Sequence, residues 1–510
     1  MRKIKHLRWY IAGLLCLATI INYVDRMTWN LTSPIIGNVI VLCFSDKDTA
    51  IVKGNAEKAL AAVFTDKAPG QITALVNQEY DRHVQYVRSS TKFNDEQISA
   101  MPESERALFG VLKKAMDDRI KALVAIVVIA FEIGYILGPT PLGAMLDRLG
   151  TRKGYPLTMA MWSAAGIITI FSVQIGAFID RFLPMPVIPV VAGFAFCRFI
   201  LGVGEAGNWP AAIKSIGEWF PARERSFAMG WFNSGSSLGA FLAPIIVGLM
   251  VHGNAWQPPY IVVGLAGYLW IIGWLALYHS PEKHPRITKE EYDYIISDRP
   301  VEDPATQAKL PFWEGLKYRQ VRGVLMSRFC SESVWKFCTY WLPLYFTQER
   351  NVKLSSMFIF VALTALSSEF GNLVGGWLSS HFIKIGWTIN KSRKSVMAPC
   401  GILMISALFI PRVPLGAAVA MLSVLTFCYQ AWSVNMQTIP ADVVPRRALG
   451  STAGMAHMTA GLAGFTISLL TGKLSYTAMF TIIGLASFAA LVLLFVAIGR
   501  IDPEIKEATA

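Results

Sequence analysis

The chain has 510 residues, of which 54% are hydrophobic and only 16% are charged, and its mean hydropathy is +0.44. This balance is far from that of a soluble globular domain and favours a membrane protein. The net charge of +13 would suit nucleic-acid binding, but the basic residues form no stripe along one soluble domain, which argues against that class.

Apolar runs of roughly twenty residues, the length that spans a bilayer, recur along the chain. The first run is too long for a cleaved signal peptide and too polar at its end, with Asp25 and Arg26, so it is interpreted as the first spanning helix. The expected fold class is therefore an all-α membrane protein. Twelve spans are predicted, at residues 10–36, 122–146, 156–180, 187–213, 226–251, 258–279, 324–347, 353–380, 395–411, 414–438, 447–472 and 475–499.

Two polar segments divide these spans. Residues 44–121 contain as many acidic as basic side chains and carry helix-period apolar residues, which predicts a small helical cap outside the membrane. A structural role for this insertion is favoured over capture of a substrate or partner. Residues 280–322 are charged and proline-containing and indicate a cytoplasmic linker. The predicted domains are an N-terminal six-helix bundle at 1–279 and a C-terminal six-helix bundle at 323–510.

Basic residues gather at the N-terminus and in every second connection between spans. This is the positive-inside pattern, and it predicts that both termini lie in the cytoplasm. The seven cysteines have no paired spacing, and His381 and His457 have no metal-ligand partners nearby in the sequence. No nucleophile-base set or phosphate-binding loop indicates an enzyme.

Four ionisable residues lie inside the apolar runs of the first and fourth spans. Arg198 and Glu205 are seven apart in the fourth span and share one helix face, whereas the adjacent Asp25 and Arg26 diverge by about 100° around the first span. A charge at bilayer depth costs at least a few kcal/mol on insertion scales, so it is retained for pairing or for handling a polar solute. Arginine grips a carboxylate with two parallel donors, and burial favours the protonated form of a carboxyl. The four residues predict a carrier of an organic acid together with a proton.

The seventh span carries Arg328, Glu332 and Lys336 at i, i+4 and i+8, on one helix face. One interpretation is a salt-bridge ladder inside the bundle. The other is that Lys336 reaches the central cavity as a second contact for an anion.

The two halves also look related, as in transporters built from repeated bundles. GAMLDRLGTRKG at 143–154 follows the second span, and GGWLSSHFIKIGWTINKSRK at 375–394 follows the eighth. Asp147, Arg148 and Arg152 are predicted to form a charge cluster that latches helices in one conformation. The alternative is that these are ordinary positive-inside turns.

The pattern Gly-x-x-x-Asp-Arg-x-Gly-x-Arg within 143–152 resembles the signature of the major facilitator superfamily. NYVDR at 22–26, RFILGVGEAGNWPAAIKSIGEWFPARER at 198–225 and FNSGSSLGAFLAP at 232–244 resemble its anion:cation symporter family, especially bacterial hexuronate transporters. The resemblance implies the major facilitator fold, twelve transmembrane helices in two six-helix bundles, here with the extra helical extracytoplasmic insertion.

The resemblance also implies roles for single residues. Asp25 and Glu205 would be the proton-coupling carboxyls, and Arg26 would bind the substrate carboxylate. Arg198 is assigned to the charge network with Arg328 and Glu332. Further substrate contacts are expected from Tyr23, Tyr135, Asn233, Ser236, Lys336 and Asn435, although such polar residues also join helices to one another.

The predicted function is import of a hexuronate by proton symport through alternating access, across the inner membrane. The proton is the coupling ion, no other cofactor is expected, and the protein is expected to be a monomer with a small anionic substrate. A carrier of another sugar acid (aldonate or aldarate) or organic anion is the first alternative. A drug/proton exporter is the second, against which the deep Arg26 argues, and a non-transporting receptor is a further minor class.

Overall fold

The computed structural model describes residues 3–61, 64, 68–89, 102–182, 188–251, 255–297, 312–350, 352, 354–444, 446–471 and 474–501. Within these residues the elements are helices, and the one β-bridge, between Ile4 and Ile287, ties the N-terminus to the linker. Ten of the described helical segments are long and apolar enough to cross a membrane. The chain is thus a multi-pass membrane protein.

The N-terminal bundle contains the first six predicted spans, each of which falls on a helical segment. The third continues through a short 3-10 turn into α8, and the fourth is divided into α9 and α10. Its helices are α1 (Leu7–Leu42), α5 (Glu103–Leu137), α6 (Pro139–Leu149), α7 (Thr151–Ile168), α8 (Ser172–Phe182), α9 (Pro189–Glu205), α10 (Asn208–Trp219), α11 (Ala222–Met250) and α12 (Gln257–Leu277).

The C-terminal bundle contains the other six spans. Its helices are α14 (Arg319–Leu344), α15 (Leu354–Lys384), α16 (Ile389–Met404), α17 (Leu415–Val443), α18 (Arg446–Thr471) and α19 (Tyr476–Leu493), the last extended by a π-helical turn at Leu494–Ile498. The twelve-helix, two-bundle prediction is confirmed. The short helix α13 (Lys289–Ile296) lies in the linker, whose residues 298–311 are outside the described part of the chain.

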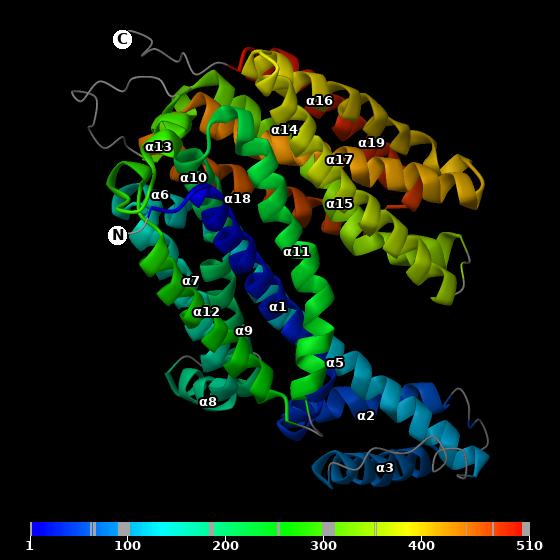
Figure 1. Ribbon diagram of the computed structural model, residues 1–510. Helices are drawn as coiled ribbons and strands as arrows, with labels where there is room; N and C mark the ends of the chain where they lie inside the picture. The colour runs from blue at the N-terminus through cyan, green and yellow to red at the C-terminus, as the bar shows by residue number, and fades with distance from the viewer. Residues whose placement is uncertain are drawn as a thin grey trace.

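The two bundles lie against each other at one end of the molecule and diverge toward the other (Figure 1). One end of the molecule, where α1 begins and where the Leu494–Ile498 turn ends, is called the termini face. The opposite end carries α2 (Asp46–Ala61) and α3 (Pro69–Ser89) and is called the insertion face.

The predicted helical insertion is confirmed, and it packs against α1 and α5. Side chains of α2, α3 and the first turns of α5 share a small apolar core that includes Val52, Val76 and Leu112. A partly buried ion pair between Asp48 of α2 and Arg119 of α5 lies beside this core. Because α5 runs unbroken from the cap to Leu137, the second span begins inside the insertion.

The fourth span is broken at Ala206 and Gly207, between α9 and α10. Close helix contact precedes the break, since a Cβ added at Gly202 would lie 2.3 Å from the carbonyl oxygen of Phe131 on α5. Small residues at such contacts let membrane helices approach closely. The break leaves Glu205 at the end of α9, fully buried in the middle of the bundle.

Candidate functional site

A cavity lies between the two bundles. The N-terminal bundle supplies side chains from α1, α5, α10 and α11, and the C-terminal bundle supplies them from α14, α15, α17 and α18. The polar and aromatic side chains that line it are Tyr23, Arg26, Tyr135, Trp209, Asn233, Ser236, Arg328, Glu332, Trp335, Lys336, Asn372, Tyr429, Gln430, Ser433, Gln437 and His457.

Arg26 and Glu205 form the charged centre of the N-terminal wall. The Nη2 and Nε atoms of Arg26 lie 2.9 Å and 3.2 Å from the Oε2 atom of Glu205, whose other carboxylate oxygen has no partner among the described residues. The guanidinium also lies over the ring of Tyr135, 4.6 Å from its centroid, and over that of Tyr23, at 5.2 Å. The cation that was predicted to bind a substrate carboxylate is therefore held by a carboxylate of the protein.

Asp25 points away from the cavity, as the 100° spacing from Arg26 predicts. It is 2% exposed, and its carboxylate faces the backbone of α7, where a Cβ at Gly166 would lie 3.5 Å from both carboxylate oxygens. Within the described part of the chain it makes no hydrogen bond or ion pair. It interacts electrostatically with Glu205, Arg198 and Arg26, so the four ionisable residues form one electrostatic group.

Arg198 belongs to this group but does not pair directly with Glu205. Its guanidinium lies over the rings of Trp29 and Phe131, 4.7 Å and 5.6 Å from their centroids. These cation–π contacts replace part of the hydration that the buried cation has lost. Arg198 thus packs behind the residues that line the cavity and does not line the cavity itself.

The C-terminal wall is built around the charged face of α14. Arg328 Nη2 lies 3.8 Å from Glu332 Oε2, and the hydroxyl of Tyr429 on α17 donates to the same oxygen at 2.8 Å. The ring of Trp335 stacks on that of Tyr429. Lys336 lines the cavity as well, with its aliphatic stem against Gly464 of α18. The Arg328–Glu332 pair agrees with the ladder interpretation, and the position of Lys336 in the lining agrees with the cavity interpretation. That Lys336 contacts an anion stays a prediction.

Polar contacts connect the two walls across the cavity. The Asn233 amide on α11 donates to Gln437 of α17 at 3.3 Å, and the Tyr135 hydroxyl lies 2.9 Å from His457 of α18. Ser236 lines the cavity while its hydroxyl donates to the carbonyl oxygen of Asn233. The sequence had assigned no site to His457, because its partner lies on a distant helix.

The structure does not place Asn435 at the cavity, so that prediction is wrong. On α17 the cavity-lining residues Tyr429, Ser433 and Gln437 follow a spacing of four. Asn435 stands two residues from Ser433, about 200° around the helix. Its side chain is fully buried and joins helices instead, donating to the carbonyl oxygens of Gly375 and Ala431 and accepting from Ser226.

The termini face is closed by a first seam, the α6–α18 seam, centred on Asp147. Its carboxylate accepts from the backbone N–H groups of Gly450 and Ser451 at 2.9 Å and 2.7 Å, and lies 2.5 Å from Lys214 Nζ of α10. The predicted cluster with Arg148 and Arg152 is wrong. Both arginines are exposed, and Arg152 donates to the carbonyl oxygen of Leu275 on α12. Asp147 therefore joins one bundle to the other through backbone amides.

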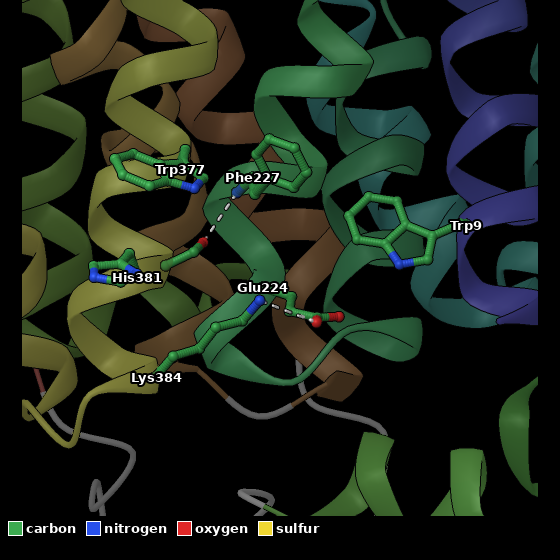
Figure 2. Close-up of a pocket in the computed structure, with 7 residues that line it drawn as sticks. Trp9, Glu224, Phe227, Trp377, His381 and Lys384 are labelled. Carbon is green, nitrogen blue, oxygen red and sulfur yellow. Dashed lines mark hydrogen bonds and ion pairs between the residues drawn. The ribbon is translucent and has the colours of Figure 1, made fainter.

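A second seam, the α11–α15 seam, closes the same face on the other side of the bundles. Asp442 of α17 pairs with Arg225 of α11 at 2.7 Å and with the fully buried Arg393 of α16 at 3.1 Å. Figure 2 shows the outer part of this seam, where the Phe227 N–H on α11 donates to Ser380 of α15. In the same view the ammonium of Lys384 reaches Glu224 at 3.6 Å, across a hollow bordered by Trp9 and Trp377.

Residues 106–468, more than half of the chain, match the family model of the Major Facilitator Superfamily. The chain belongs to this superfamily. The solved proton:xylose symporter XylE bound to 6-bromo-6-deoxy-D-glucose has the same fold, with a TM-score of 0.60 at 14% identity and 97% of each chain covered. The chain is accordingly a membrane transporter and not an enzyme.

Two curated relatives in the superfamily extend the comparison. The hexuronate transporter of Escherichia coli K12 is 30% identical over 362 residues, which cover 70% of this chain and 79% of that protein. The D-galactonate transporter of Escherichia coli O6:H1 is 28% identical over 366 residues, which cover 70% of this chain and 81% of that protein. This major facilitator protein thus has sugar-acid transporters among its relatives.

Proposed function

We propose that the protein imports a hexuronate, such as glucuronate or galacturonate, by proton symport through alternating access. The observation that carries the proposal is the Arg26–Glu205 pair at the cavity wall, with the unpartnered, buried Asp25 behind it. The relatives that carry a hexuronate and a galactonate support a sugar acid as the solute.

The pair suggests how proton and substrate binding are coupled. A substrate carboxylate and Glu205 compete for the same guanidinium, because Glu205 already accepts from both Nε and Nη2 of Arg26. Protonation of Glu205 removes the competing charge and leaves Arg26 free to hold the substrate with two donors. When Glu205 loses its proton on the other side of the membrane, it reclaims Arg26 and the substrate leaves.

Asp25 supplies a second proton position in this scheme. Burial without a partner disfavours an ionised carboxyl strongly. Proton transfer to and from Asp25 changes the charge of the electrostatic group without changing any direct contact of Arg26. The net charge of this group, which must favour binding of an anion, is therefore set by protonation and does not require movement of helices.

We further propose that the termini face is cytoplasmic and that the carrier is a monomer in the inner membrane. The support is the positive-inside pattern, because basic residues such as Arg148, Arg152 and Lys391 are exposed on this face. The closed seams then correspond to a conformation that is shut toward the cytoplasm. Alkaline phosphatase is active only in the periplasm, so a fusion of this enzyme after residue 510 should be inactive in intact cells. An active fusion would show that the C-terminus lies in the periplasm and would contradict the proposed orientation.

Uptake into proteoliposomes tests the coupling. With the interior alkaline, labelled glucuronate or galacturonate should accumulate above the external concentration, and a protonophore should abolish the accumulation. Accumulation that is equal with and without the pH gradient would contradict proton symport, and accumulation that requires sodium instead would replace the coupling ion.

An aldonate or aldarate is the second candidate substrate class, and within it the position of Lys336 favours the aldarate, which has two carboxylates. Lys336 and Arg328 place cations on the wall opposite Arg26, where a second carboxylate of an aldarate would be attracted. Competition of labelled galacturonate uptake by unlabelled glucuronate, galactonate and galactarate separates the cases. Inhibition by galactarate at lower concentration than by glucuronate would favour the dicarboxylate.

A further inference from the structure

His457 of α18 occupies an unusual position in the cavity wall. It is 9% exposed and lines the cavity, and its Nε2 atom lies 2.9 Å from the hydroxyl oxygen of Tyr135 on α5. Its ring stacks on that of Trp209 on α10, with centroids 5.3 Å apart and planes inclined by 18°. The other ring nitrogen, Nδ1, is buried and has no hydrogen-bond partner among the described residues. A side chain of the C-terminal bundle, His457, thus contacts two side chains of the N-terminal bundle, Tyr135 and Trp209.

The Tyr135–His457 hydrogen bond lies at the cavity end of the α6–α18 seam. From the termini face inward, Asp147 binds the amides of Gly450 and Ser451. One turn deeper, a Cβ at Gly454 would lie 2.2 Å from the carbonyl oxygen of Pro139, so the two backbones are in close contact. His457 is the next position along the same face of α18. The Tyr135–His457 hydrogen bond thus continues the line of contacts that closes this seam.

The same pair borders the predicted anion site. The ring of Tyr135 lies 4.6 Å from the guanidinium carbon of Arg26, so the hydroxyl and the imidazole continue the wall that begins at the guanidinium. Imidazole and phenol groups both donate and accept hydrogen bonds, as the hydroxyls of a sugar acid require. An unpartnered buried nitrogen is costly, so a ligand hydroxyl that reaches Nδ1 gains by satisfying it.

Given the proposed sugar-acid transport, on which this step rests, we propose that His457 contacts the substrate, and that its hydrogen bond to Tyr135 completes the binding site only while the α6–α18 seam is closed. Opening of the seam moves α18 away from α5 and divides the site between the bundles. The affinity for the sugar acid then falls, and the solute is released toward the termini face. By linkage, occupancy of the site favours the closed seam to the same extent.

Equilibrium binding to the purified full-length protein tests the proposal. Calorimetric titration with D-glucuronate and D-galacturonate compares the wild type with His457→Ala, Tyr135→Phe and the double variant. Each single change should raise Kd about tenfold, the loss expected for one hydrogen bond in a buried site. The double variant should be little weaker than either single one, because both remove the same unit. His381→Ala is the matched control, since this histidine is exposed on α15, outside the cavity.

Two further variants separate a contact from a merely structural role. His457→Gln keeps a side-chain donor and acceptor and should recover part of the affinity, whereas His457→Phe keeps the stacking on Trp209 and should not. If the His457 variants do not fold, Tyr135→Phe alone carries the test, because it removes one oxygen atom. Wild-type affinity in Tyr135→Phe and His457→Ala, or equal loss in the Gln and Phe variants, would overturn the proposal. A wild type that binds no sugar acid would instead refute the proposed function.

Discussion

Anion recognition at the residue scale depends on the shape of the Arg26 side chain. Arg26→Lys keeps the charge but loses the planar fork that reaches Glu205 with Nε and Nη2. The KM for hexuronate uptake should rise by at least about tenfold, the scale of a lost charge-assisted hydrogen bond. Initial uptake rates in proteoliposomes measure it, with the exposed Arg152→Lys as control. An unchanged KM would remove Arg26 from the substrate site.

Proton coupling is a second residue-scale property, and it is assigned to Glu205. Glu205→Gln keeps the size and one acceptor oxygen beside Arg26, but it has no carboxyl to load and release a proton. The variant should exchange external and internal substrate while losing accumulation driven by a pH gradient. Counterflow and gradient-driven uptake are measured on the same vesicles, and Glu290→Gln on the exposed linker helix is the control. Full accumulation by Glu205→Gln would place the coupling elsewhere.

The sequence predicted the charged residues of the cavity better than its aromatic ones. Arg26, Glu205 and Lys336 stand out because charges are costly in apolar runs, whatever the helices around them do. Trp209 does not stand out because aromatic residues make up 12% of the chain, and His457 was given no site because a single histidine shows no partner nearby in the sequence. They meet only because α10 packs against α18 across the bundle interface, and no local pattern encodes such a contact.

At the scale of elements, the contact between α5 and α9 depends on glycine. A Cβ at Gly202 would lie 2.3 Å from the carbonyl oxygen of Phe131, which the helix cannot move aside. Gly202→Ala should therefore lower stability by about 1–3 kcal/mol, as overpacking does. Thermal unfolding in detergent should show a clearly lower Tm. Gly248→Ala is the matched control, because nothing lies within 4 Å of its added Cβ, and an equal Tm for both variants would contradict the close packing.

The helical cap has a pH dependence of its own. Burial, with Lys113 and Arg82 adding, lowers the pKa of His83 to about 4. Because the unfolded imidazole titrates near 6.5, the unfolded cap binds more protons between these values, and stability falls as the pH drops from 6.5 to 4. Burial acts to raise the pKa of Asp48, but hydrogen bonds from Ser45 and Arg119 lower it overall, so Asp48 also loses stabilisation on acidification.

Hydrogen exchange of the cap measures this effect. Protection of α3 should fall by about 2 kcal/mol between pH 6.5 and 4.5, after correction for intrinsic exchange rates. Burial raises the pKa of Glu79, so this residue stabilises the cap on acidification and partly offsets the effect of His83. A variant of His83 separates the two contributions. His83→Phe should flatten the pH profile, and an unchanged slope in that variant would assign the dependence to other groups.

At the scale of the whole molecule, hydropathy was enough to predict twelve spans and two bundles, because the bilayer sets the length of each apolar run. It was not enough to predict which bundle contacts close the termini face. Asp147 was predicted from its motif to be a latch residue, yet its partners are Lys214 and two backbone amides of α18. Backbone donors carry no sequence signal, so the neighbouring Arg148 and Arg152 were chosen in their place.

This latch leads to a prediction about the balance between conformations. Asp147→Asn keeps the size of the side chain but removes the charge, one acceptor and the pairing with Lys214. Hydrogen bonds to charged groups contribute about 1.5–3 kcal/mol each, so the population with an open termini face should rise at least tenfold. Spin labels at Arg148 and Lys391, exposed on opposite bundles at this face, should show a longer interbundle distance by pulsed electron resonance. Asp180→Asn, at the end of α8 on the insertion face, is the control. An unchanged distance distribution in Asp147→Asn would mean that the α11–α15 seam alone holds the termini face closed.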